Sequence, residues 1–183
     1  EENKRLELLN ETGHDDSYLK KLNDLRENGI PPFSLPDSET ESVETLRNKF
    51  ESVDEFDEKE YSIHGKLISL RGRGAMQFAD LVDNQAKIQL VIKRDTLNEY
   101  AELENRLENF AIWKKDVTVG DRVLVKGNLM RTQTGELSLR VNSWKMLSKT
   151  LRELTDIEKI DHTKFIERTE YLSRIRRDLL SNG

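Results

Sequence analysis

The sequence predicts a mainly β domain with α additions: five strands closed into a small barrel, with N-terminal helices and one C-terminal helix. Three observations indicate this class. Apolar and polar residues alternate between residues 61 and 147 with the period of two that marks half-buried strands. Outside this region apolar residues recur at the three- and four-residue spacings of amphipathic helices. The 183 residues are 35% hydrophobic, which allows one modest core with appendages.

We divide the chain into a helical arm with an acidic linker (1–59), the barrel (60–152), and a further linker with a helix (153–183). The helical pattern of the arm starts near Glu2. It is predicted to end at Asn28-Gly29, because a C-cap glycine followed by Pro31-Pro32 does not continue a helix. The last part has an apolar stripe at helical spacing from Phe165 to Leu179.

A second short helix is predicted at Val43 to Phe50, with Ser42 as its N-cap. The acidic stretch Glu51 to Glu60 is predicted to be a solvated linker. A single helix is also expected inside the barrel region, from an N-cap at Asp95 to about Trp113.

The strands are predicted from Tyr61 to the Arg71-Gly72 break, then at Met76 to Asp83, Ala86 to Lys93, Asp121 to Met130 and Glu136 to Leu147. The order is therefore three strands, one helix and two strands. This is the order of the five-stranded oligonucleotide-binding (OB) fold. That fold is a Greek-key barrel whose second and third strands and adjoining loops usually hold the ligand.

The net charge of −5 conceals a marked asymmetry along the chain. Residues 61–152 carry 16 basic and 10 acidic side chains, a net +6, whereas residues 1–60 carry a net −10. A basic region of this kind indicates a polyanionic partner for the barrel alone. A solvated surface that happens to be positive would account for the charge equally well.

Other classes are excluded by composition. The chain has no cysteine and no apolar run of the length that a membrane span requires, so we expect neither a disulfide scaffold nor a membrane partner. A reducing, cytoplasmic compartment fits. The start, Glu-Glu-Asn, has no initiator Met and no leader, which indicates a piece of a longer protein.

One face of the predicted barrel gathers groups suited to single-stranded RNA. Phe78 should point outward, because Ala79 and Leu81 take the core side of the second strand. Splayed bases stack on aromatic rings, and an amide from Gln89 with a carboxylate from Glu136 can read uracil-like edges. The adjoining basic residues expected to contact the RNA are Arg71, Arg73, Lys87, Lys93, Arg131 and Arg140.

Each of these residues also has a plainer interpretation. Phe78 could be core beneath the N-terminal helix, and Gln89 and Glu136 could be solvated strand residues. The set as a whole indicates a binding face more strongly than any member does. The three histidines are too scattered for a metal site, and the sequence has neither a phosphate loop nor a serine elbow, so no catalytic residue and no metal site are predicted.

Several motifs resemble the N-terminal anticodon-binding domain of class II lysyl-tRNA synthetases. The resemblance spans about ninety residues. Its motifs are Ile63-His64-Gly65-Lys66, Phe78-Ala79-Asp80-Leu81-Val82-Asp83, Val119-Gly120-Asp121, Thr132-Gln133-Thr134-Gly135-Glu136-Leu137-Ser138 and Leu147-Ser148-Lys149-Thr150-Leu151-Arg152, with Gly29-Ile30-Pro31-Pro32-Phe33 before the barrel.

The resemblance implies that Phe78 stacks on the central uridine of the lysine tRNA anticodon, that Gln89 and Arg71 bond its edge, and that Glu136 contacts a neighbouring base. It also implies a homodimeric enzyme that attaches lysine to its tRNA through a lysyl-adenylate, using ATP and Mg²⁺. Gly74-Ala75-Met76-Gln77 departs from the family's usual Gly-Lys-Ala-Ser and removes one expected phosphate contact.

The helix from Phe165 resembles the start of the first class II motif, and motifs two and three are absent from the sequence. This chain, with no cofactor of its own, is therefore expected to bind the anticodon stem-loop without aminoacylating the tRNA. Two alternatives stay open: a stand-alone synthetase-like OB-fold adaptor that binds tRNA or protein, and a generic single-strand-binding barrel.

Overall fold

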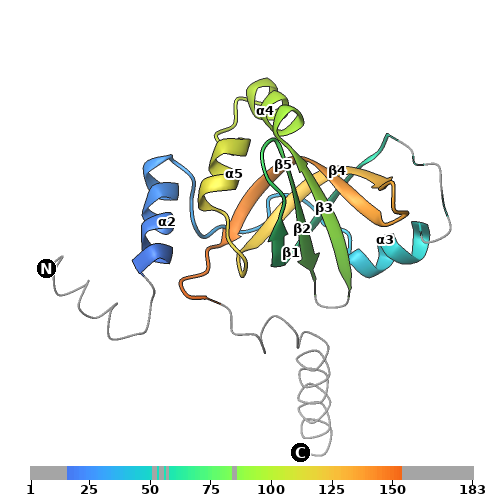
Figure 1. Ribbon diagram of the computed structural model, residues 1–183, viewed down its shortest axis with the longest axis horizontal. Helices are drawn as coiled ribbons and strands as arrows, with labels where there is room; N and C mark the ends of the chain where they lie inside the picture. The colour runs from blue at the N-terminus through green and yellow to red at the C-terminus, as the bar shows by residue number, and fades with distance from the viewer. Residues whose placement is uncertain (1–15, 51–52, 54–55, 57, 84–85, 154–183) are drawn as a thin grey trace, which may run out of the picture. The chain divides into compact units, whose positions relative to one another are not determined.

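The computed structural model describes residues 16–50, 53, 56, 58–83 and 86–153, which belong to a compact unit of residues 1–153. Figure 1 shows the barrel and the helices around it. The helical pattern before residue 16 and the helix expected from Phe165 lie outside the described residues.

Five strands form a closed barrel in the order β1-β2-β3-β5-β4. Neighbouring strands are antiparallel except β3 and β5, which are parallel. This is a five-stranded barrel of the predicted OB-fold class, so the predicted fold class is confirmed. The strands are β1 Glu60–Arg71, β2 Met76–Val82, β3 Lys87–Lys93, β4 Arg122–Arg131 and β5 Leu137–Ser148.

Strand β1 closes the barrel because it pairs with two partners. Its first half, up to Lys66, pairs with β4, and the rest pairs with β2. A register shift between Leu67 and Ser69 marks the change of partner, and such irregularities bend a strand. Gly127 of β4 allows the closest approach, because a Cβ atom there would lie 1.9 Å from the carbonyl oxygen of Arg140.

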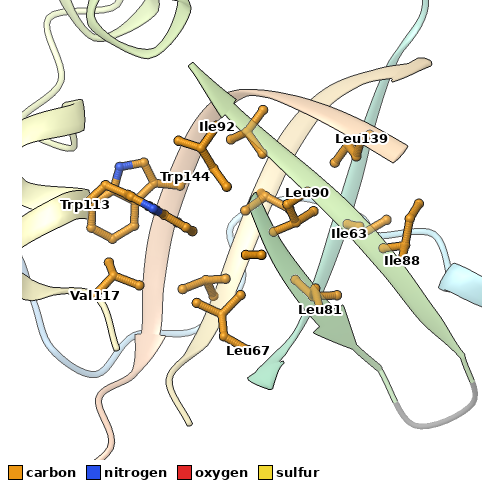
Figure 2. Close-up of a cluster of buried hydrophobic side chains, with 14 of the residues drawn as sticks. Ile63, Leu67, Leu81, Ile88, Leu90, Ile92, Trp113, Val117, Leu139 and Trp144 are labelled. Carbon is orange, nitrogen blue, oxygen red and sulfur yellow. The ribbon is translucent and has the colours of Figure 1, made fainter. Parts of the chain in front are cut away.

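The inward side chains of all five strands fill the barrel, as the alternation predicts. Trp113 closes one end of this cluster: its ring packs edge-on against Trp144 of β5, with 5.3 Å between centroids and 84° between planes. Ile63, Ile88 and Leu139 lie at the other end in Figure 2. All five residues are essentially inaccessible to solvent.

The first helix of the arm ends, and the second helix begins and ends, where the sequence predicts. Helix α2, Asp16–Glu27, ends at Gly29, which has φ 75°, and the amide of Ile30 donates to the carbonyl of Leu25 at 2.9 Å. Helix α3, Val43–Phe50, has the predicted bounds. Ser42 Oγ accepts from the amide of Thr45 at 3.1 Å, so the predicted N-cap is confirmed.

The single helix predicted before the fourth strand is wrong, because the structure has two: α4, Arg94–Leu103, and α5, Phe110–Asp116. Asn105 adopts a left-handed φ of 50° just beyond α4. Asn109 then caps α5 with its side-chain oxygen. Asp95 is not an N-cap: it lies in the first turn of α4, whose cap position is Lys93.

The acidic linker is not uniformly solvated. Val53 and Phe56 pack against the core, and the ring of Phe56 lies 5.8 Å from that of Phe50. The prediction of a solvated linker is therefore wrong for these two residues. Residues 51–52, 54–55 and 57 lie outside the described residues.

Candidate nucleic-acid interface

The strand register assembles two rows of side chains on the outer face of the barrel. Cross-strand partners share a face of the sheet. The first row consists of Arg71, Phe78, Val91 and Arg140, on β1, β2, β3 and β5 in turn; the second consists of Ser69, Asp80, Gln89 and Ser138 on the same strands. The register thus brings three of the predicted base-reading residues into adjacent rows, and Glu136 lies two residues before Ser138.

Phe78 is partly exposed and lies outside the core cluster, whereas its neighbours Ala79 and Leu81 are fully buried. The N-terminal helix packs elsewhere: Asp24 of α2 pairs with Lys115 of α5 at 2.9 Å. The interpretation of Phe78 as core beneath that helix therefore does not hold for the described residues. Its side chain lies on the outer face and is partly exposed.

Arg71 is held in place by two side chains of the second row. Its Nη1 donates to Asp80 Oδ2 at 2.7 Å and to Ser69 Oγ at 2.9 Å, and its Nη2 lies 3.3 Å from Asp80 Oδ1. Ser69 Oγ also donates to Asp80 Oδ2 at 2.7 Å. The side chain of Arg71 remains 45% exposed and that of Asp80 only 13%.

The charges of this pair are mutually stabilised. Burial by itself would raise the pKa of Asp80, but the hydrogen bonds from Arg71 and Ser69 outweigh it and hold the pKa below the usual range. The hydrogen bond with Asp80 in turn raises the pKa of Arg71. Glu136 adds a smaller attraction to Arg71, which places the predicted carboxylate within electrostatic reach of the predicted guanidinium.

Gln89 is more covered than the sequence predicts, at 7% exposure. Val91 in the adjacent row of the same strand is likewise only 2% exposed. The Gln89 amide is oriented by its partners: Ser138 Oγ donates to Oε1 at 3.0 Å, and Nε2 donates to Glu136 Oε2 at 3.3 Å. Glu136 itself is exposed.

Four of the five supporting cations are exposed, namely Arg73, Lys87, Lys93 and Arg140. The structure gives Arg131 a structural role instead of that of a free cation. Its guanidinium donates to the carbonyl oxygens of Val53, Phe50 and Gly135 at 3.0 to 3.1 Å. It therefore ties the end of α3 and the linker to the β4–β5 turn.

Sequence reasoning placed Ser138 on the outer face but assigned no role to it, to Asp80 or to Ser69, and these three residues orient the predicted base-reading residues. A signal for Asp80 was present, because it lies two residues after Phe78 and so shares its face of the strand. In the described part of the chain, no group of three or more His, Asp or Glu side chains is placed to hold a metal ion. No helix in that part is long and apolar enough to cross a membrane.

A closed five-stranded Greek-key barrel is the architecture of the OB fold, and an aromatic ring with polar groups on its outer face suits unstacked bases. Residues 61–147 match the tRNA anticodon family model, which describes an OB-fold nucleic acid binding domain. The match covers the strands of the barrel and the helices between them.

The chain is also homologous to lysine–tRNA ligases. It is 34% identical over 188 aligned positions to the enzyme of Streptococcus pneumoniae serotype 4, covering 90% of this chain and 36% of the relative. The enzymes of Pediococcus pentosaceus and Lactiplantibacillus plantarum are 34% and 33% identical, covering 87% and 89% of this chain and 31% of each relative. The chain thus spans about a third of the length of these curated relatives, and the predicted resemblance to the anticodon-binding region of this enzyme class is confirmed.

Proposed function

We propose that this chain reads the anticodon of lysine tRNA as the N-terminal part of a lysine–tRNA ligase. The observation that carries the proposal is Phe78, which is partly exposed on the outer face beside Arg71 in its own row and Gln89 in the next. A base stacked on such a ring contributes about 1–3 kcal/mol of binding. The polar groups around the ring can then select which base is bound.

The polar groups suit uracil. A uracil edge presents an N–H donor between two carbonyl acceptors, so it needs both donors and an acceptor from the protein. Arg71 and the Nε2 amide of Gln89 supply donors, and the exposed carboxylate of Glu136 supplies an acceptor for an N–H of the central or a neighbouring base. The central uridine on Phe78 is the position that this arrangement serves best.

The exposed cations bind the phosphate backbone of the RNA. Arg73, Lys87, Lys93 and Arg140 are exposed on the barrel strands and the β1–β2 loop, so they can follow phosphates on either side of the stacked base. Contacts of this kind carry no sequence information, and they make binding depend on salt. Affinity should therefore come from the cations and selectivity from the two rows.

In the whole enzyme, lysine would be attached to its tRNA through a lysyl-adenylate, with ATP and Mg²⁺, by a cytoplasmic homodimer. We assign those steps to the part of such an enzyme that the alignment does not cover, roughly two thirds of the relatives' length. This chain alone would bind tRNA and not aminoacylate it. Incubation with lysine, ATP, Mg²⁺ and lysine tRNA should therefore yield no charged tRNA.

The decisive experiment measures binding of a lysine anticodon stem-loop to the chain and to Phe78→Ala. We expect Phe78→Ala to weaken binding by about 5- to 150-fold, the equivalent of about 1–3 kcal/mol, with an unchanged circular dichroism spectrum. Phe33→Ala is the matched control, because Phe33 is 50% exposed and lies outside the barrel strands.

Two results would overturn the proposal. Equal binding by Phe78→Ala would mean that the ring does not stack, and loss of fold would mean that it is core. A stem-loop whose central uridine is replaced by cytidine separates anticodon reading from general single-strand binding, because a generic barrel would bind both stem-loops equally.

A further inference from the structure

We propose that Asp80 is a positioning residue that fixes which edge of Arg71 faces the base, and thereby sets the preference for uracil over cytosine. The inference rests on the proposed function and deepens it. The observation behind it is that a largely buried carboxylate holds a half-exposed guanidinium through two of its three nitrogens, beside the only aromatic ring of the first row.

The hydrogen bonds determine which donors of Arg71 are left over. A guanidinium has five N–H donors. The two on Nη1 go to Asp80 and Ser69, and one on Nη2 points to the other oxygen of Asp80. Within the described residues, the remaining donors are Nε–H and one Nη2–H, which lie side by side on the same edge of the guanidinium.

This remaining edge is a fork of two donors with no acceptor. It matches a carbonyl oxygen such as uracil O4, where cytosine carries an amino group that is itself a donor. If Asp80 did not occupy the far edge, the guanidinium could rotate about its long side chain and present other donors. Arg71 alone would then attract RNA without distinguishing the two pyrimidines.

The contacts of Asp80 are consistent with this role. The hydrogen bonds of its carboxylate within the described residues come from Arg71 and Ser69, both on β1. Ser69 pairs directly with Asp80 across the two strands, and Arg71 is two residues further along β1. Asp80 therefore acts on the base through Arg71, since its own carboxylate is covered by the guanidinium.

The test compares binding of stem-loops with uridine or cytidine at the centre by four proteins: wild type, Asp80→Asn, Arg71→Ala and the double variant. Asparagine keeps the size of the side chain but donates where Arg71 needs an acceptor. We expect the uridine preference of the wild type to fall by about tenfold in Asp80→Asn, while the affinity for the cytidine stem-loop changes little. In the Arg71→Ala background, Asp80→Asn should change the preference no further.

The design separates the possible failures. If the wild type binds neither stem-loop, or both equally, the proposed function itself fails. Two results with a discriminating wild type would overturn the positioning role. One is that Asp80→Asn keeps the wild-type preference for uridine. The other is that Asp80→Asn lowers this preference by the same factor in the Arg71→Ala background as in the wild-type background. Should Asp80→Asn not fold, Ser69→Ala removes one of the bonds that hold Arg71, and it must lower the preference in the wild-type background only.

Discussion

The strongest stability prediction concerns a fully buried ion pair where the chain leaves the barrel. Lys149 Nζ lies 2.8 Å from Asp121 Oδ2, and neither side chain is accessible to solvent. Lys149 also donates to the carbonyl oxygen of Asp116 at 2.6 Å and to Thr118 Oγ1 at 2.7 Å. The pair thus joins the end of β5 to the connection between α5 and β4. We predict that Lys149→Met will strongly destabilise the fold.

The magnitude follows from the geometry. Two unit charges 2.8 Å apart attract by about 6 kcal/mol at an effective dielectric constant of about 20, and the cost of removing both from water offsets much of this. Removing one partner leaves the other charge unpaired, which usually costs about 3–5 kcal/mol. Asp121 keeps the amides of Thr118 and Thr150 as donors, each at 2.8 Å. We therefore expect Lys149→Met to lower the free energy of unfolding by about 3 kcal/mol, the lower end of this range.

Urea denaturation at two pH values tests the reasoning. Burial raises the pKa of Asp121, and loss of the Lys149 charge should raise it further. A carboxyl with a raised pKa contributes stability that is present below its unfolded pKa and is lost as the pH rises through its folded pKa. The loss in free energy of unfolding caused by Lys149→Met should therefore be largest at neutral pH and become smaller as the solution is acidified.

A matched double variant completes this test. Asp121→Asn in the Lys149→Met background removes the stranded charge and should recover part of the lost stability at neutral pH. A deficit below about 1 kcal/mol in Lys149→Met, the size of an exposed pair, would refute the reasoning, and so would a deficit that does not change with pH.

Three further predictions concern stability. Asp116 is buried, its two carboxylate oxygens have no hydrogen-bond partner within the described residues, and burial raises its pKa; Asp116→Asn should therefore raise the urea midpoint at neutral pH and flatten its pH dependence. Gly127→Ala should lower the free energy of unfolding by about 3 kcal/mol, because the new Cβ atom would overlap the carbonyl of Arg140. Gly74→Ala is the comparison: its φ is 72° but the space around it is open, so it should lower the free energy of unfolding by only about 1–2 kcal/mol. Trp113→Ala should cost about 3–5 kcal/mol by opening the end of the core, and thermal unfolding would measure it.

The strands could be predicted because each has one face in a single core. Ile88, Leu90 and Ile92 are all fully buried, as their alternation indicates. The break between α4 and α5 could not be predicted from the period, because Leu107 continues the apolar spacing yet is 53% exposed in the connection. The signal was Asn109, whose side chain offers a cap only if a new helix starts there.

The outer face of the barrel could be predicted only in part, for a physical reason. Alternation states which side of a strand a residue occupies, and this placed Phe78 correctly. It does not state what lies beside that residue once the barrel closes. Gln89 is therefore buried and bonded to Ser138 and Glu136. Arg131 donates to three backbone carbonyls, two from segments far away in the sequence and one across a turn.

The alternation that builds the core also fixes the geometry of the outer face. Ala79 and Leu81 are locked inside the barrel, so Phe78 and Asp80 cannot turn without disturbing the packing. The proposed base-reading site on such strands would be preorganised, and little side-chain entropy would be lost on binding RNA. Arg73 lies in the loop beyond, between two glycines with positive φ, where no such constraint acts. Selectivity should therefore depend on the strand residues, and the loop should contribute affinity that salt can weaken.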